Sequence, residues 1–169
     1  ITDKLDYIAG LGVTALYLNP VFEAPTNHRY DTTDYFTVDG DLGSNAALGE
    51  LFSTAGAAGL SVILDGVFNH VSAESAWFDL DDTHATVGAC ESSASDYRDW
   101  FFIPDIGAPA STEDGETVYC GGQTYESWGT YFHLPRLDSE EPEVRSVIFS
   151  QGTDSVAGHW LDQGARGWR

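Results

Sequence analysis

Residues 60–70 read LSVILDGVFNH and decide the fold that we expect. Four of the first five are apolar, and two of these are β-branched, which is typical of a strand buried on both faces of a parallel sheet. Polar side chains then follow at Asp65, Asn69 and His70. In barrel enzymes the carboxyl end of such a strand faces the active site. We therefore predict a buried strand over 60–65 that ends at a functional edge.

The segments before this strand repeat one order of elements. Residues 13–18 (VTALYL) form another short apolar run without polar alternation, again predicted as a strand buried on both faces. Apolar residues at helical spacing precede each strand, over 2–9 with Thr2 as the expected cap and over 44–55, and glycines follow both segments. Helices alternating with strands through short links predict a parallel α/β fold.

This regular order stops after His70. From 71 to 137 aromatic residues are scattered among Ser, Gly and Asp without sustained periodicity. A structureless loop of that length is improbable inside a domain, so we predict an inserted subdomain whose aromatic side chains mostly pack in its own core. One helical rhythm then runs from Pro142 to about Gly164, and residues 167–169 open a further strand.

The length suits part of a larger barrel. Without the insertion roughly 100 residues remain, which is about three of the eight units of a (β/α)8 barrel at about 31 residues each. We predict that residues 1–70 form the first part of the barrel, 71–137 the inserted subdomain, and 138–169 the barrel's continuation. The fold class is thus α/β, a partial TIM barrel with a subdomain after its third strand.

The charge excludes two classes of partner. The net charge is −20 with only seven Lys and Arg residues, so we expect neither nucleic acid nor anionic membrane to bind. Solubility and adaptation to high salt both explain such acidity. No basic segment followed by an apolar stretch opens the chain, so no signal peptide is visible.

The two cysteines, Cys90 and Cys120, lie in the irregular segment. A disulfide between them would close a loop of about 31 residues and contribute roughly 3–4 kcal/mol in the chain-entropy model. Free thiols and half of a metal site with His84 are the alternatives, although the spacing matches no zinc signature. We favour the disulfide, which implies an oxidising compartment and a secreted or extracytoplasmic protein, with the cytoplasm as the alternative.

Several side chains near the predicted strand ends carry candidate chemistry. A carboxylate at Asp65 needs a cationic partner, for which Arg169 is the candidate. His70 can donate to a substrate hydroxyl, and Asn69 can offer a carbonyl oxygen to calcium. Tyr30 can stack on the apolar face of a sugar ring. The alternative is structural: Asp65 and His70 cap a loop, and Tyr30 anchors an exposed turn.

Five segments occur in the order and spacing of one known family: 2–18, 20–36 (PVFEAPTNHRYDTTDYF), 65–70, 134–138 (LPRLD) and 167–169 (GWR). Together they resemble glycoside hydrolase family 13, the α-amylase family, and most closely its neopullulanase, cyclomaltodextrinase and maltogenic-amylase branch. The likeness runs along essentially the whole chain. It implies an internal fragment of the catalytic barrel, with the small domain inserted after the third strand.

The resemblance also implies retaining hydrolysis or transfer at α-1,4, and sometimes α-1,6, glucosidic bonds of starch and maltodextrin. It makes Tyr30 and His70 the residues that bind the sugar at the cleavage point. It makes Arg169 the residue that orients the nucleophile, with Asp65 as the structural partner of that arginine. Aromatic side chains of the insertion also suit sugar stacking.

The family places its nucleophilic Asp two positions beyond Arg169 and its acid/base Glu on a later strand. We therefore expect no catalytic residue within the chain, and no activity from the chain alone. No cofactor is required by this chemistry, and calcium is doubtful because Arg136 stands where many amylases carry an Asp ligand. The alternative function is a non-catalytic amylase-like barrel used for binding or assembly.

Overall fold

The computed structural model describes residues 1–103, 120 and 124–169. Parts of the predicted inserted subdomain, residues 104–119 and 121–123, lie outside the described residues. The chain divides into two compact units, and each is described by itself. The sheet unit comprises Ile1–Glu23, Tyr35–Gly66 and Val147–Arg169, and the loop unit comprises Ala24–Asp34 and Val67–Ser146.

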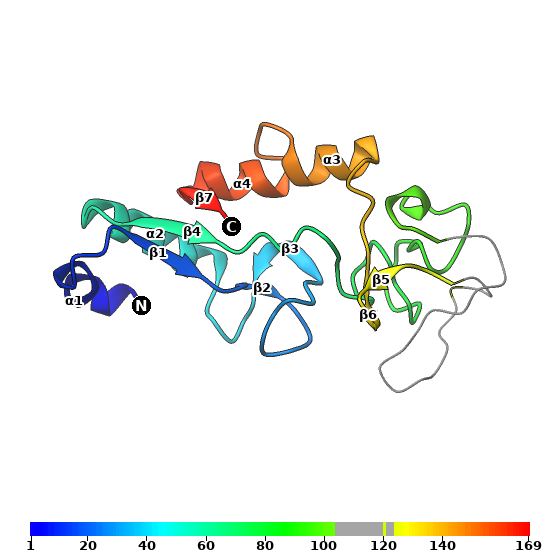
Figure 1. Ribbon diagram of the computed structural model, residues 1–169, viewed down its shortest axis with the longest axis horizontal. Helices are drawn as coiled ribbons and strands as arrows, with labels where there is room; N and C mark the ends of the chain where they lie inside the picture. The colour runs from blue at the N-terminus through cyan, green and yellow to red at the C-terminus, as the bar shows by residue number, and fades with distance from the viewer. Residues whose placement is uncertain (104–119, 121–123) are drawn as a thin grey trace. The chain divides into compact units, whose positions relative to one another are not determined.

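A parallel three-stranded sheet organises the sheet unit (Figure 1). Its strands are β1 (Ala15–Leu18), β4 (Ser61–Leu64) and β7 (Gly167–Trp168), in the order β1-β4-β7. Leu18 pairs with Leu64, and Leu64 pairs in turn with Trp168. The predicted parallel pairing of the segments around 60–65 and 167–169 is confirmed. A smaller sheet joins β2 (Phe22–Glu23) to β3 (Asp34–Val38).

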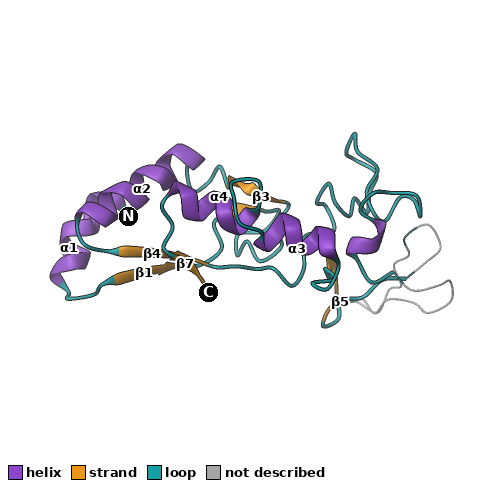
Figure 2. Cartoon of the chain, turned by 90° about the horizontal axis from the view of Figure 1, so that it is seen from above, coloured by secondary structure: helices purple, strands orange, loops and turns teal. Residues whose placement is uncertain are grey.

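Helices of the sheet unit cover one face of this sheet. Figure 2 shows α1 (Leu5–Gly10), α2 (Asn45–Ala57) and α4 (Val156–Gln163) along one side of the strands. Val62 and Leu64 of β4 are buried, whereas the neighbouring Tyr17 of β1 is 43% exposed. The prediction that residues 13–18 are buried on both faces was therefore wrong. An apolar run indicates a strand, but burial of each face depends on which elements pack against it.

The helix starts differ from one another in their capping. Ser44 caps α2, because its Oγ accepts a hydrogen bond from the backbone N–H of Ala47 at 3.2 Å. Thr2 does not cap a helix as predicted. It lies in the 3-10 turn η1 (Thr2–Lys4), and Ile1 precedes that turn without a side-chain cap. The chain therefore enters α1 through a tight turn rather than through a polar cap.

The helical rhythm predicted from Pro142 to Gly164 is broken into two helices, α3 (Pro142–Phe149) and α4. Gly152 has a φ of +111°, a left-handed conformation that suits glycine and ends helical geometry. Ser155 then starts α4 by accepting a hydrogen bond from the N–H of Gly158 at 3.0 Å. Apolar spacing alone did not reveal the break, because buried residues recur at intervals of four on both sides of it, at Val144 and Ile148 and at Val156 and Trp160.

Aromatic packing and short elements hold the loop unit together. Phe78 is fully buried, and its ring meets Phe101 and Tyr125 edge-to-face at 5.0 and 4.7 Å. Trp100 is buried as well, whereas the other described aromatics of the insertion are partly buried or exposed, so the prediction that most of them pack in its core holds only in part. The structure joins Cys90 to Cys120 in a disulfide. The described regular elements here include η2 (Arg98–Trp100), β5 (Ser127–Trp128) and β6 (Tyr131–Pro135), the last two antiparallel.

Residues 24–34, which follow β1 along the chain, join the loop unit through hydrogen bonds. The N–H of Ser72 donates to the carbonyl of Thr32 at 2.8 Å. His70 and Tyr30 make a second contact, at 2.9 Å between the ring Nε2 and the backbone carbonyl. These bonds bring the two segments that carry Tyr30 and His70 side by side.

Candidate functional site

Three side chains meet at the carboxyl ends of the parallel strands. Asp65 directly follows β4, Arg169 directly follows β7, and Tyr17 belongs to β1. The hydroxyl of Tyr17 donates to Oδ2 of Asp65, and NH1 of Arg169 donates to the Tyr17 hydroxyl at 3.1 Å. The same NH1 lies 3.5 Å from Oδ2 of Asp65. We call these three residues the strand-end cluster.

Charge organises the strand-end cluster. The Asp65 side chain is 4% exposed and the Arg169 side chain 66% exposed, so the carboxylate is enclosed while the guanidinium faces outward. Tyr17 and Asp65 raise the pKa of Arg169, and its guanidinium also lies 5.3 Å from the centroid of the Tyr17 ring. A pair this exposed on one side contributes little to stability. The pair instead determines where the guanidinium lies, because Asp65 and Tyr17 both hold NH1 of Arg169.

Sequence reasoning named Asp65 and Arg169 but missed Tyr17. The missing signal was register, because Tyr17 pairs with Ile63 and therefore shares with Asp65, two residues further on, one side of the sheet. Tyr17 is also the only residue of β1 (Ala15–Leu18) whose side chain can form a hydrogen bond. Both facts are readable from the sequence once the pairing is known.

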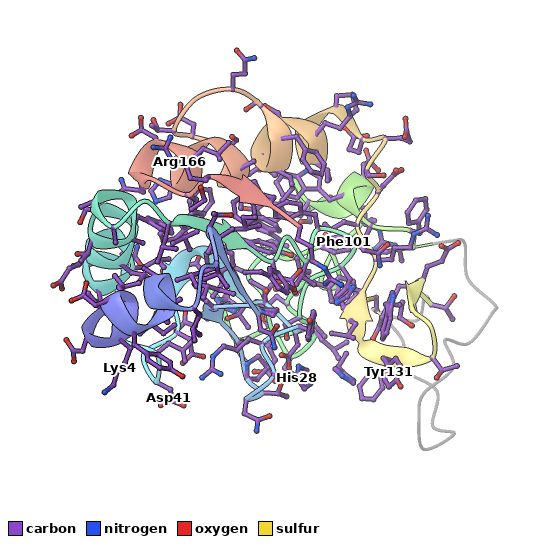
Figure 3. The ribbon with its side chains drawn as sticks, turned by 60° about the vertical axis from the view of Figure 1, so that its left-hand side comes forward. Lys4, His28, Asp41, Phe101, Tyr131 and Arg166 are labelled. Carbon is purple, nitrogen blue, oxygen red and sulfur yellow. A yellow bond between two sulfur atoms is a disulfide. The ribbon has the colours of Figure 1, made fainter. Side chains whose placement is uncertain are left out.

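A second arrangement lies wholly within the loop unit. It is a hollow of about 470 Å³, which falls within the usual size range of small-molecule sites. Two of its lining residues are labelled in Figure 3, His28 and Tyr131. The complete lining is His28, Tyr30, His70, Trp128, Tyr131, His133 and Leu134. Two predicted binding residues, Tyr30 and His70, thus share one pocket.

His70 is held as a neutral imidazole. A carbonyl oxygen only accepts, so the 2.9 Å contact with Tyr30 requires a proton on Nε2 of His70. The other ring nitrogen of His70, Nδ1, lies 3.3 Å from Nδ2 of Asn69 and can accept a hydrogen bond from it. Burial lowers the pKa of His70, against the opposing effects of the Tyr30 carbonyl and of Asp31. A substrate hydroxyl at Nε2 would therefore compete with a protein carbonyl.

Aromatic surface dominates the rest of the hollow. Tyr30 is 36% exposed, and its ring lies 6.0 Å from that of His28. Trp128 and Tyr131 come from β5 and β6 and are also exposed. Sequence reasoning treated the aromatics of the insertion as a group and did not single out these two. Their distinguishing feature is their place at a two-strand turn, which no periodic pattern marks.

Asn69, the predicted calcium ligand, has partners within the protein for two of its polar groups. The backbone carbonyl of Asn69 accepts from the N–H of Leu137, and its side-chain nitrogen faces His70. The neighbouring Arg136 forms an ion pair with Glu126 at 2.8 Å and lies over the Phe102 ring. Across residues 1–103, 120 and 124–169 no group of three or more His, Cys, Asp or Glu side chains is placed to hold a metal ion.

Comparison with known proteins shows the family to which this chain belongs. The description "Alpha amylase, catalytic domain" matches residues 1–169. This chain belongs to the α-amylase family. The strand-end cluster and the loop-unit hollow are thus parts of an α-amylase catalytic domain, as the order of the five sequence segments predicted. Among the described helices of this family member, none has the length and apolarity needed to cross a membrane.

Individual relatives are similar along the whole of this α-amylase chain but are much longer. It is 38% identical to the amylopullulanase of Thermoanaerobacterium saccharolyticum, over 100% of this chain and 13% of that protein. It is 35% identical to neopullulanase 2 of Thermoactinomyces vulgaris, over 100% of this chain and 26% of that protein. A solved structure of the Nostoc punctiforme debranching enzyme matches with a TM-score of 0.79 at 37% identity, over 100% of this chain and 31% of that one.

Proposed function

We propose that this chain supplies the substrate-binding and nucleophile-orienting part of a retaining α-glucan hydrolase or transglycosylase. The substrates would be starch, maltodextrin or related oligosaccharides with α-1,4 or α-1,6 glucosidic bonds. The single observation that carries the proposal is the strand-end cluster, in which Arg169 is braced by Tyr17 and Asp65 at the ends of parallel strands. Within the α-amylase family this arrangement has a direct chemical use.

That use follows from the chemistry of a retaining glycosidase. One carboxylate attacks the anomeric carbon, an acid protonates the leaving oxygen, and water then hydrolyses the glycosyl-enzyme intermediate. A guanidinium that donates to the attacking carboxylate fixes its direction and keeps it ionised. We assign that task to Arg169 and assign both carboxylates to segments of the parent protein outside this sequence.

The groups of the hollow would bind the substrate. Tyr30 offers an exposed aromatic face to the apolar side of a glucose ring. His70 borders the same hollow, and its Nε2–H would exchange the Tyr30 carbonyl for a sugar hydroxyl. In the complete barrel we expect Tyr30 and His70 to follow strands of one (β/α)8 domain, with residues 71–137 as its insertion. The Cys90–Cys120 disulfide favours a protein exported from the cytoplasm.

A chimera tests this proposal directly. The segment of neopullulanase 2 that aligns with this chain, over 170 residues, is replaced by residues 1–169. We expect the chimera to release reducing sugar from maltodextrin, with the α-anomer formed first in the NMR spectrum. Arg169→Ala should lower kcat by on the order of a hundredfold or more, because a preorganised donor to the reacting carboxylate is lost.

Arg166→Ala is the matched control, because Arg166 is an exposed arginine three positions earlier and lies outside the strand-end cluster. It should leave kcat unchanged. A folded chimera that binds maltodextrin without cleaving it would favour the non-catalytic alternative. Equal activity of the Arg169 and Arg166 variants would overturn the role assigned to Arg169.

A further inference from the structure

The β5–β6 hairpin exposes two large aromatic side chains next to each other. Trp128 is 51% exposed and Tyr131 is 36% exposed. Their rings stack with centroids 5.4 Å apart and an interplanar angle of 18°. The interior aromatics of the same unit, Phe78, Phe101 and Tyr125, are buried at 5% exposure or less. Paired exposed rings beside a hollow are a recurring mark of a binding surface.

The indole N–H of Trp128 differs from those of three other tryptophans. Trp100 donates its Nε1–H to Glu143, Trp160 to the carbonyl of Tyr35, and Trp168 to the carbonyl of Ala157. Nothing among the described residues accepts a hydrogen bond from Nε1 of Trp128. Trp128 therefore has both an apolar surface and a polar edge to offer to a ligand.

The position of Trp128 is fixed by its neighbours. Its ring lies 5.8 Å from the His70 ring as well as 5.4 Å from that of Tyr131. Contact on two sides limits the freedom that the indole would lose on binding, which favours affinity. The indole also borders the same hollow as Tyr30 and His70. A chain of sugar rings that starts at Tyr30 and His70 would meet Trp128 with its next members.

We propose that Trp128, supported by Tyr131, is a second stacking subsite that binds the glucose ring next to the one held by Tyr30 and His70. This inference rests on the proposed function, because it assumes an α-glucan in the hollow. A pyranose ring suits the site, since its C–H face packs on an indole and its hydroxyl oxygens can accept a hydrogen bond from the indole N–H. The acidity of the chain argues against an anionic ligand.

Nuclear magnetic resonance on the 15N-labelled 169-residue chain separates the subsites. The five tryptophans give five indole N–H signals, and Trp128→Phe and Trp77→Phe identify two of them. We expect maltotetraose to shift the Trp128 signal and to leave the Trp77 signal in place. Trp77 is the matched control, because it belongs to the loop unit but packs on Trp100, outside the lining of the hollow.

Affinity measurements give the magnitude. Trp128→Ala should weaken maltotetraose binding roughly tenfold, the size expected for one aromatic contact, and should leave glucose binding unchanged. Trp77→Phe should change neither. Should Trp128→Ala disturb the fold, Trp128→Phe keeps one aromatic ring, removes the N–H and part of the stacking surface, and should weaken maltotetraose binding by a smaller factor.

The outcomes distinguish the two proposals. Shifts of the His70 ring signals with an unmoved Trp128 signal, or unchanged affinity in both Trp128 variants, would overturn the second subsite and leave the proposed function standing. If maltotetraose moves neither His70 nor Trp128, glucan binding by the hollow is contradicted, and the subsite falls with it.

Discussion

The two units of this chain position their polar side chains by different means. In the sheet unit the backbone ladder does so: Asp65 and Arg169 meet because β4 and β7 pair in parallel and end together. In the loop unit the described strands contain only two and five residues, so individual hydrogen bonds position the side chains instead. His70 is fixed by the carbonyl of Tyr30, from a segment 40 residues earlier in the chain.

Asp79 is a buried carboxylate of the loop unit that is held by hydrogen bonds from nearby backbone groups. It is completely buried, and its carboxylate accepts backbone N–H groups from Thr83 at 2.9 Å and His84 at 2.8 Å. Burial by itself would raise the pKa of Asp79, but these donors lower it below its ordinary value. The comparison teaches that a unit without long ladders depends on satisfied polar groups and on its covalent cross-link.

Reduction of the disulfide should therefore have the largest effect and should act on one unit. Both cysteines of the chain belong to the loop unit. Freeing a loop of about 31 residues should lower the free energy of unfolding of that unit by roughly 3–4 kcal/mol. Hydrogen exchange with mass spectrometry, on the native chain and on the Cys90→Ala, Cys120→Ala double variant, measures protection in each segment.

Peptides from β1, β4 and α2 are the internal control in that experiment, since they contain no cysteine. Their protection should stay unchanged while protection around Phe78 and Phe101 falls. An equal loss in both units would show that they unfold together and would break the comparison.

The same contrast explains what the sequence could predict. Regular elements leave periodic patterns, so the strands at 15–18 and 61–64, the helix at 45–57 and the parallel pairing with 167–168 were all predictable. Asp65 and Arg169 were then predictable from their places at strand ends. Local pattern is enough here because the backbone itself determines where the side chains go.

Tyr17, Trp128 and the break between α3 and α4 needed information that local pattern does not contain. The role of Tyr17 depends on strand register, and that of Trp128 on a turn between two short strands. The exposed face of β1 depends on which side the helices take. Each is a tertiary property, and apolar periodicity reports only local geometry.

Ser155 lies in the sheet unit but starts α4 through local side-chain hydrogen bonds, as residues of the loop unit do. Replacing it tests how much such local bonds contribute to stability. It is fully buried, and its Oγ both accepts from Gly158 and donates to the carbonyl of Ser150. Ser155→Ala should lower the free energy of unfolding by about 1–2 kcal/mol, because it removes a helix cap and leaves the partly buried N–H of Gly158 without its partner.

Ser44→Ala is the matched control, since Ser44 caps α2 at an exposed position. Its cost should be smaller, about 0.5–1 kcal/mol, because water can replace the lost hydroxyl. Urea denaturation of both variants measures the difference. A larger loss for Ser44→Ala than for Ser155→Ala would contradict the idea that buried local bonds determine the break.

The smallest expected effect is the pH dependence that His70 gives to the loop unit, because a single group titrates. Burial holds the pKa of His70 below its ordinary 6.5, so between the two values the unfolded chain binds more protons than the folded one. Stability from neutral His70 is therefore complete above about pH 6.5 and is lost as the pH falls through the folded value. Hydrogen exchange of the loop unit between pH 5 and 8 should show this loss, and His70→Gln, which keeps a donor for the Tyr30 carbonyl, should reduce it.

His159→Gln, in the sheet unit, is the control and should leave the pH profile of the loop unit unchanged. Identical profiles for the native chain and both variants would mean that His70 does not sense pH through its buried contacts.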